Sequence, residues 1–217
     1  MIAQSKKWAI VGVLAVIGGL IGITMASAAG PTWSLFGNAI SVIDGVGPNT
    51  GAIQLSSTCN FTGATPTCDF TTLTFSGVGF QPAGPLTFSS ITQLSTDFNV
   101  GGSDCGGGSP RFQINIDTDG DGNLDGNVFV YLGPHPNFTG CFFGWQNTGN
   151  LISSTDLRYD TSQVGGTFYH DYAGALALVG PDSVLGVQLV VDGGWFIPRG
   201  QAVLVDNVTL NNHKLTQ

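Results

Sequence analysis

The sequence predicts an all-β protein, an antiparallel two-sheet β-sandwich of the jelly-roll kind with one short helix. Short runs of β-branched and aromatic residues alternate with clusters of Gly, Pro, Asn and Asp along most of the 217 residues. The 33 glycines and the charged fraction of only 9% argue against a helical protein rich in salt bridges. No repeat period and no long structureless gap is visible, so we expect one β-rich domain.

Strand-like segments recur along this domain. In two of them, residues 69–75 and 112–116, apolar and polar residues alternate, which assigns one face of each strand to the core. A near-continuous apolar run at 183–191 is typical of a strand near the middle of a sandwich. The expected strands cover residues 33–42, 52–56, 68–75, 86–94, 111–116, 127–132, 183–191 and 201–210.

One segment has helical spacing instead. Between Thr167 and Val179, apolar residues recur at every third or fourth position, and Thr167 is the expected N-cap. The Gly-Pro pair that begins at Gly180 ends the pattern. We therefore expect a single helix over 167–179.

The N-terminal residues have the features of a secretory signal. Lys6 and Lys7 precede an apolar run, which is followed by small residues at 26–29. Cleavage after Ala28 or Ala29 would remove a signal peptide at residues 1–29 and leave one β-sandwich domain at residues 30–217. The alternative is an uncleaved N-terminal anchor, because the run approaches the length that spans a bilayer. Both interpretations predict a secreted or cell-surface protein, and after cleavage no membrane association is expected.

The negative charge of the chain limits the classes of partner that it can bind. The formal net charge is −8 and the sequence contains no Glu, so all 14 acidic residues are Asp. Such a surface repels phosphate backbones, which excludes nucleic acid as an expected partner. Asp is instead the usual oxygen donor for hard cations.

Four cysteines, Cys59, Cys68, Cys105 and Cys141, indicate disulfides in an exported chain. None of them forms a C-x-x-C pair, which argues against a zinc ribbon or thioredoxin-like site. Three connectivities are open. Because Cys59 and Cys68 bracket a loop-like segment, we favour Cys59 with Cys68 and Cys105 with Cys141.

The densest group of acidic residues lies between two expected strands. Oxygen-bearing side chains alternate along it, and Gly122 occupies the sixth place, where a calcium loop turns sharply. Such spacing lets one short loop surround a single ion with several oxygens. The expected metal ligands are Asp117, Asp119, Asp121, Asn123 and Asp125.

This loop is not an EF-hand, because its twelfth position is Val128 in place of Glu and strands flank it on both sides. It resembles the D-x-D-x-D-G calcium loops of dockerins, thrombospondin-type repeats and many secreted β proteins. The resemblance implies a bound Ca2+. The alternative is an acidic hairpin tip without an ion, although its four carboxylates would then repel one another.

A second resemblance lies at the C-terminal end. Residues 203–210 resemble the closing strand of carbohydrate-binding jelly-roll modules. In those modules an aspartate at this place helps to hold a structural calcium near the N-terminal strand, which implies a second metal ligand at Asp206. The alternative is an ordinary alternating strand with a solvent-facing Asp206.

Aromatic side chains are the expected ligand-binding residues, because a flat ring stacks on the apolar face of a sugar. Trp145 lies beside two amides, and Trp195 follows a Gly-Gly turn. Tyr131 is a third candidate, and further aromatic residues are Tyr169 and Tyr172. The alternative for each tryptophan is a place in the core.

Catalytic motifs are missing from the sequence. It contains no G-x-S-x-G elbow, no H-E-x-x-H and no phosphate loop, and without Glu a glycosidase would need two Asp. We therefore expect a calcium-stabilised module that binds polysaccharide or another extracellular polymer. The alternatives are a structural or adhesive surface protein or assembly subunit, and a polysaccharide hydrolase or lyase of the same fold. The sequence does not indicate the oligomeric state.

Overall fold

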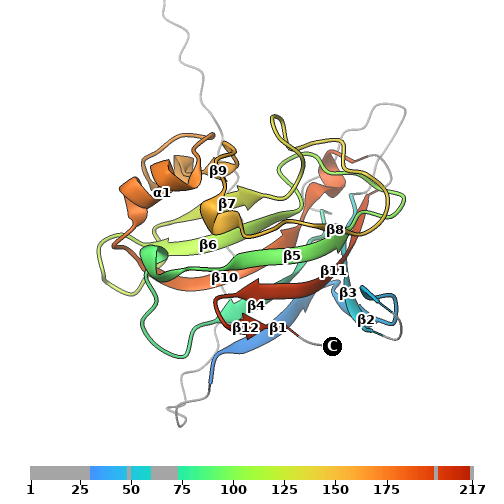
Figure 1. Ribbon diagram of the computed structural model, residues 1–217, viewed down its shortest axis with the longest axis horizontal. Helices are drawn as coiled ribbons and strands as arrows, with labels where there is room; N and C mark the ends of the chain where they lie inside the picture. The colour runs from blue at the N-terminus through green and yellow to red at the C-terminus, as the bar shows by residue number, and fades with distance from the viewer. Residues whose placement is uncertain (1–29, 48–49, 60–72, 198–199, 216–217) are drawn as a thin grey trace, which may run out of the picture.

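The computed structural model describes residues 30–47, 50–59, 73–197 and 200–215. These residues form two antiparallel β-sheets that pack face to face, with one α-helix beside them (Figure 1). The predicted fold class is therefore confirmed. The predicted signal segment at residues 1–29 lies outside the described residues. Within the described part of the chain, no helix is long and apolar enough to cross a membrane.

The first sheet has the strand order β1-β4-β10-β6-β7-β9. Its strands are β1 (Thr32–Gly37), β4 (Ser76–Gln81), β10 (Ser183–Val191), β6 (Arg111–Asp117), β7 (Gly126–Tyr131) and β9 (Tyr159–Asp160). The second sheet has the order β2-β3-β11-β5-β8, and β12 pairs with β11. Its strands are β2 (Ile40–Val42), β3 (Ala52–Ser57), β11 (Gln201–Leu210), β5 (Leu94–Asn99), β8 (Gln146–Asn147) and β12 (His213–Lys214).

The helical segments are short and lie outside the two sheets. They are α1 (Tyr172–Val179) and the 3-10 helices η1 (Phe88–Ser90), η2 (Leu151–Ser153), η3 (Ser162–Val164) and η4 (Gly193–Trp195).

The connections between strands make the sandwich a jelly roll. The chain changes sheet between β3 and β4, between β4 and β5, and between β5 and β6. The late strand β10 then inserts between β4 and β6, while β11 inserts between β3 and β5. The central part of each sheet is thus a set of four strands, β4-β10-β6-β7 in the first and β3-β11-β5-β8 in the second. Two such sets with these crossovers are the jelly-roll arrangement.

The core lies between the sheets and is built from alternate residues of each strand. In β6 the side chains of Phe112, Ile114 and Ile116 are fully buried, whereas Gln113 and Asn115 between them are half-buried. This confirms the alternation predicted for residues 112–116. The polar residues of β6 therefore face outward from the first sheet.

The predicted strand at 33–42 is two strands that belong to different sheets. β1 pairs with β4 in the first sheet, and β2 pairs with β3 in the second. Gly37 makes the break, since its φ is +62° and a Cβ there would lie 2.1 Å from the carbonyl oxygen of Phe75. Only glycine fits this close approach.

Two other predicted strands begin too early. The first of these was predicted at 68–75. Residues 68–72 lie outside the described residues, and residues 73–75 do not belong to a strand. The observed strand, β4, begins at Ser76. Its glycines weaken the sequence pattern of β4. The predicted strand at 86–94 contains η1 instead, and β5 starts only at Leu94. There the Ser90 hydroxyl donates to the Thr87 carbonyl at 2.7 Å and closes a turn.

The helix is shorter than predicted. Its N-cap is Asp171, whose side chain accepts a hydrogen bond from the Gly174 amide at 2.8 Å, and not Thr167. The segment before Asp171 stays extended because His170 and Tyr159 exchange two backbone hydrogen bonds of 2.8 and 2.9 Å. The predicted end at Val179 before Gly180 is confirmed.

A disulfide joins Cys105 and Cys141, as the nearest-neighbour pairing predicts, with a Cα–Cα distance of 5.3 Å. One Asp104 carboxylate oxygen accepts hydrogen bonds from the backbone amides of both cysteines, each at 2.7 Å. Cys59 is also disulfide-bonded, and its predicted partner Cys68 lies outside the described residues. The Cys105–Cys141 disulfide thus joins the loop between β7 and β8 to the loop between β5 and β6.

Cys105 and Cys141 are 36 residues apart in the sequence, so the disulfide between them closes a loop and restricts the unfolded chain. We expect a Cys105→Ala, Cys141→Ala double variant to lose ~2–4 kcal/mol of unfolding free energy. Alanine is chosen because Cys105 is buried and serine would add an unsatisfied hydroxyl there. Urea denaturation measures the change, and an unfolding free energy equal to that of the wild type would contradict the expectation.

Candidate functional site

The acidic loop, residues 117–125, connects two central strands of the first sheet. β6 ends at Asp117, and β7 begins directly after Asp125. Ile116 pairs with Gly126 in the ladder, and the Asp125 amide donates to the Ile116 carbonyl at 3.0 Å. The antiparallel register therefore brings the two ends of the loop side by side.

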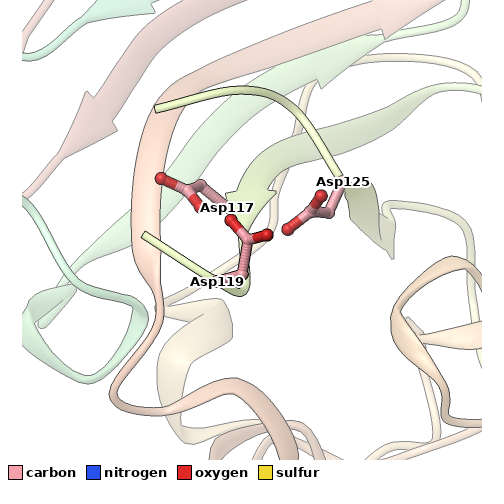
Figure 2. A group of neighbouring side chains, drawn as sticks. All are labelled: Asp117, Asp119 and Asp125. Carbon is pink, nitrogen blue, oxygen red and sulfur yellow. The ribbon is translucent and has the colours of Figure 1, made fainter. Parts of the chain in front are cut away.

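Three carboxylates converge in this loop. One oxygen each from Asp117, Asp119 and Asp125 lies within 4.8 Å of the other two. Figure 2 shows the three side chains gathered in the loop. Asp117 is only 3% exposed, whereas the other two are exposed. A cluster of carboxylate oxygens, one of them buried, suits a hard divalent cation.

Two glycines allow the loop to fold around Asp117. Gly120 and Gly122 have φ values of +78° and +84°, a conformation that other residues rarely adopt. Their backbone amides donate to the two oxygens of Asp117 at 2.7 and 2.9 Å. These amides replace water around the buried carboxylate, so the sharp turn has a direct structural role.

The remaining two predicted ligands bond to each other. The Asp121 carboxylate accepts from the backbone and side-chain nitrogens of Asn123 at 2.8 and 2.9 Å. Both residues are exposed, and Asp121 is outside the group formed by Asp117, Asp119 and Asp125. The structure thus brings three of the five predicted ligands together and leaves the other two at the tip of the same loop.

Hydrogen bonds keep Asp125 negatively charged. The hydroxyl and the amide of Thr118 donate to one oxygen of Asp125 at 2.6 and 2.7 Å. Because these bonds favour the ionised form, they hold the pKa of Asp125 below its usual range. Asp125 is therefore available as an anionic ligand.

A further acidic residue, Asp182, lies near the cluster and was missed by the sequence reasoning. Burial raises the pKa of Asp182, and the negative charges of Asp117 and Asp125 raise it further. Its neighbour Ser183 pairs with Asp117 across β10 and β6. This proximity depends on sheet register between distant segments, so no local sequence signal could have revealed it.

Asp206, the predicted second metal ligand, lies on β11. Its two oxygens accept hydrogen bonds from the Val46 amide at 2.9 Å and the Asn207 amide at 2.6 Å. Among the described residues, Asp206 does not belong to a group of three or more side chains that could hold a metal ion. The residue therefore links the segment after β2 to β11.

The predicted aromatic residues lie on separate elements. Trp145 is half-buried and directly precedes β8 of the second sheet. Trp195 ends η4, but its side chain lies outside the described part of the structure. Tyr131 ends β7 of the first sheet and is half-buried. Tyr131 thus belongs to the first sheet, and Trp145 belongs to the segment before a strand of the second sheet.

The Tyr131 side chain makes a hydrogen bond and a ring contact with other residues of the fold. Its hydroxyl donates to Asp160 at 2.8 Å, and its ring lies 5.5 Å from that of Phe138. Burial raises the pKa of Tyr131, and the negative charge of Asp160 raises it further, so the hydroxyl keeps its proton. Tyr131 therefore acts as a hydrogen-bond donor inside the structure.

Two exposed phenylalanines were missed by the sequence reasoning. Phe142 and Phe143 are 73% and 79% exposed, and they directly follow Cys141 of the disulfide. Apolar residues next to a half-buried cysteine of a disulfide are ordinarily expected to pack inward. The useful signal was the glycine on either side of this short segment, Gly140 and Gly144, both of which have positive φ.

Comparisons with known proteins give a partial structural similarity. No protein-family model matches the chain, and no curated protein matches it. A solved structure of an exo-β-agarase is similar over 89% of this chain, with 12% sequence identity and a TM-score of 0.31. This chain spans 25% of the length of that agarase chain.

Proposed function

We propose that this protein is a calcium-stabilised β-sandwich module of the extracellular space or cell surface that binds polysaccharide or another extracellular polymer. The convergence of the Asp117, Asp119 and Asp125 oxygens within 4.8 Å carries the calcium part of the proposal. The polymer part is supported by exposed aromatic side chains and by the acidic, disulfide-bonded character of the chain.

Electrostatics supports a bound cation in the acidic loop. Three carboxylates this close together repel one another, and the hydrogen bonds of the loop offset that repulsion only in part. A divalent cation would replace the repulsion with shared coordination. The same loop could contribute Asp121 and Asn123, and Asp182 lies at its edge.

The chemistry of the ligands favours calcium over other metals. The loop offers oxygen donors, whereas zinc prefers nitrogen and sulfur. Calcium accepts an irregular cage with bonds of about 2.3–2.6 Å, while magnesium requires a near-ideal octahedron. An ion here would fix the β6–β7 hairpin at the centre of the first sheet.

Export is supported by two features of the chain. The Cys105–Cys141 disulfide is of the kind that persists in oxidising compartments. The sequence also begins with the lysine pair and apolar run that are typical of a secretory signal. The net charge of −8 is in turn unsuited to a nucleic-acid partner.

The aromatic segment at residues 142–145 supports ligand binding. Phe142 and Phe143 are exposed, Trp145 is half-buried beside Gln146, and the neighbouring disulfide anchors the segment. Rings presented on an anchored loop can stack on the apolar faces of sugar rings, while amides bond the hydroxyl groups.

A structural or adhesive role is the second candidate, and Tyr131 favours it. Its bond to Asp160 and its packing on Phe138 show an aromatic side chain that serves the fold. Arg158 has a similar structural place, since it is buried, bonds to Asp156 at 2.6 Å and lies over the Phe138 ring. Retention on polysaccharide decides between the two roles.

Calorimetry tests the calcium part. We expect wild-type protein to take up one calcium ion per chain, and Asp119→Asn to take up none, because it removes one of the three converging carboxylates. Calcium at ~100 times its dissociation constant adds ~2.7 kcal/mol of stability, which raises Tm by roughly 5–10 °C. Asp44→Asn, an equal charge change on an exposed loop residue elsewhere, is the control and should behave as wild type. Absence of calcium uptake by the wild type would refute this part.

Asp206→Asn tests whether Asp206 holds a second ion. Its hydrogen bonds to backbone amides should make the residue structural, so the variant is expected to lose ~1–3 kcal/mol of unfolding free energy with or without chelator. Urea denaturation in calcium and in EDTA gives both values. A loss that disappears in EDTA would instead assign Asp206 to a second calcium site.

Trp145→Ala tests the aromatic segment. We expect this variant to bind polysaccharide more weakly by roughly tenfold, since stacking contacts of this kind are worth ~1 kcal/mol or more. Trp145→Phe, which keeps a ring, should recover much of the binding. Affinity electrophoresis measures the binding, and thermal melting checks the fold. Unfolding of Trp145→Ala would show that the half-buried ring belongs to the core.

A further inference from the structure

The outer face of the first sheet is hollowed. A depression of about 310 Å³, here called the trough, crosses β1, β4, β10 and β6. Its lining includes Ser34, Phe36, Gly79, Gln81, Asn115 and Gln188. It lies on the face opposite the core, away from the aromatic segment at residues 142–145, which precedes β8 of the second sheet.

Glycines create the hollow. Gly79 and Gly186 line the trough and place no side chain into it. Beside them, a Cβ on Gly77 would lie 2.3 Å from the ring of Phe36, so that ring lies directly over the glycine. The glycines therefore leave space above the face of the sheet, and the apolar ring of Phe36 lines one side of that space.

Sheet register arranges polar residues in rows across the strands. Ser34, Gly79, Gln188 and Gln113 are successive partners from β1 to β6. A neighbouring row contains Gly186, Asn115 and Asn127 from β10 to β7. Neighbouring strands lie about 4.8 Å apart, so the amides recur at that spacing along the face. An extended chain could contact several of them in turn.

Two acceptors on this face have unmet hydrogen-bonding capacity. The side-chain carbonyl oxygens of Asn115 and Asn127 are buried and have no hydrogen-bond partner. The Asn127 side-chain nitrogen donates to Gln163 at 2.9 Å, which leaves its oxygen as the free group. A buried acceptor without a donor is costly, so the Asn115 side chain, which lines the trough, would gain a donor by turning its oxygen toward a ligand hydroxyl group.

The trough is neutral on a strongly acidic protein. None of its lining residues carries a charge, although the chain has a net charge of −8. It offers amide and hydroxyl groups together with the Phe36 ring, which is the combination that recognises an uncharged, hydroxyl-rich chain. A charged polymer would find no opposite charge in the lining.

From these observations we infer that the trough is a binding site for a neutral polysaccharide, with Asn115 and Gln188 bonding hydroxyl groups and Phe36 stacking on a sugar ring. The inference rests on the polymer-binding part of the proposed function and deepens it, since it adds the sheet face as a second contact site beside the aromatic segment at residues 142–145.

Filling the trough is the first test. A Cβ on Gly79 would have Ser34 Oγ at 3.5 Å as its nearest neighbour, which is ordinary contact, so Gly79→Val can fold and occupy the hollow. We expect this variant to lose roughly tenfold in affinity for neutral polysaccharide. Gly84→Val is the matched control, because a Cβ there meets no atom within 4 Å and Gly84 does not line the trough. The probes are soluble xylan, mannan, β-glucan and agarose in affinity electrophoresis, with alginate as the charged polymer.

Asn115→Leu is the second test and does not depend on Gly79→Val. It removes the unpartnered oxygen, so binding should weaken by roughly fivefold while the melting temperature stays the same or rises. A residue with only a structural role would lower the melting temperature and leave the affinity of the folded protein unchanged.

The outcomes separate the inference from the proposed function. If no neutral polysaccharide retains the wild type, both the trough inference and the polysaccharide part of the proposed function are overturned. If the wild type is retained and both trough variants bind equally well, the inference alone fails. Retention by alginate only, or a loss confined to Gly84→Val, would likewise overturn it.

Discussion

The pairing of β6 with β10 on one side and β7 on the other fixes the direction of every side chain at the centre of the first sheet. One face of β6 carries Phe112, Ile114 and Ile116 into the core, and the other presents Gln113 and Asn115. Because side chains alternate, a slip of one residue would exchange these two faces. Burial of the apolar face therefore fixes the register on which the other features depend.

The acidic loop depends on the same register. β6 ends at Asp117, which is buried and accepts bonds from the amides of Gly120 and Gly122. The partner strand β7 returns at Gly126 and sets Asp125 beside it. The sheet thus holds like charges together and stabilises an arrangement that a short isolated loop would avoid. Asp182, which directly precedes β10, is brought to this place by the same pairing.

Local sequence patterns predicted the elements with strong periodicity. β10 and β11 have the predicted bounds, β6 is one residue longer at its end, and β7 is shifted by one residue at both ends. β4 was misplaced because its glycines hide the apolar alternation of Val78 and Phe80. The division of residues 33–42 between two sheets depends on a left-handed Gly37 and its approach to Phe75, which no periodicity records.

The candidate sites show the same division. The acidic loop is contiguous in sequence, so the spacing of Asp117, Asp119 and Asp125 could predict their convergence. The approach of Asp182 and the rows of amides across β10, β6 and β7 join segments that are distant in sequence. Only the strand order of the jelly roll brings them together. Hydrogen bonding likewise decided the place of Tyr131, since its partner Asp160 lies on another strand.

A crystal structure of protein grown with calcium tests the central claim most directly, because anomalous scattering locates the ion without assuming its ligands. The account predicts one peak between Asp117, Asp119 and Asp125, with metal–oxygen distances of about 2.3–2.6 Å. A map with no peak in the acidic loop at millimolar calcium, or with its peak at Asp206 alone, would contradict it.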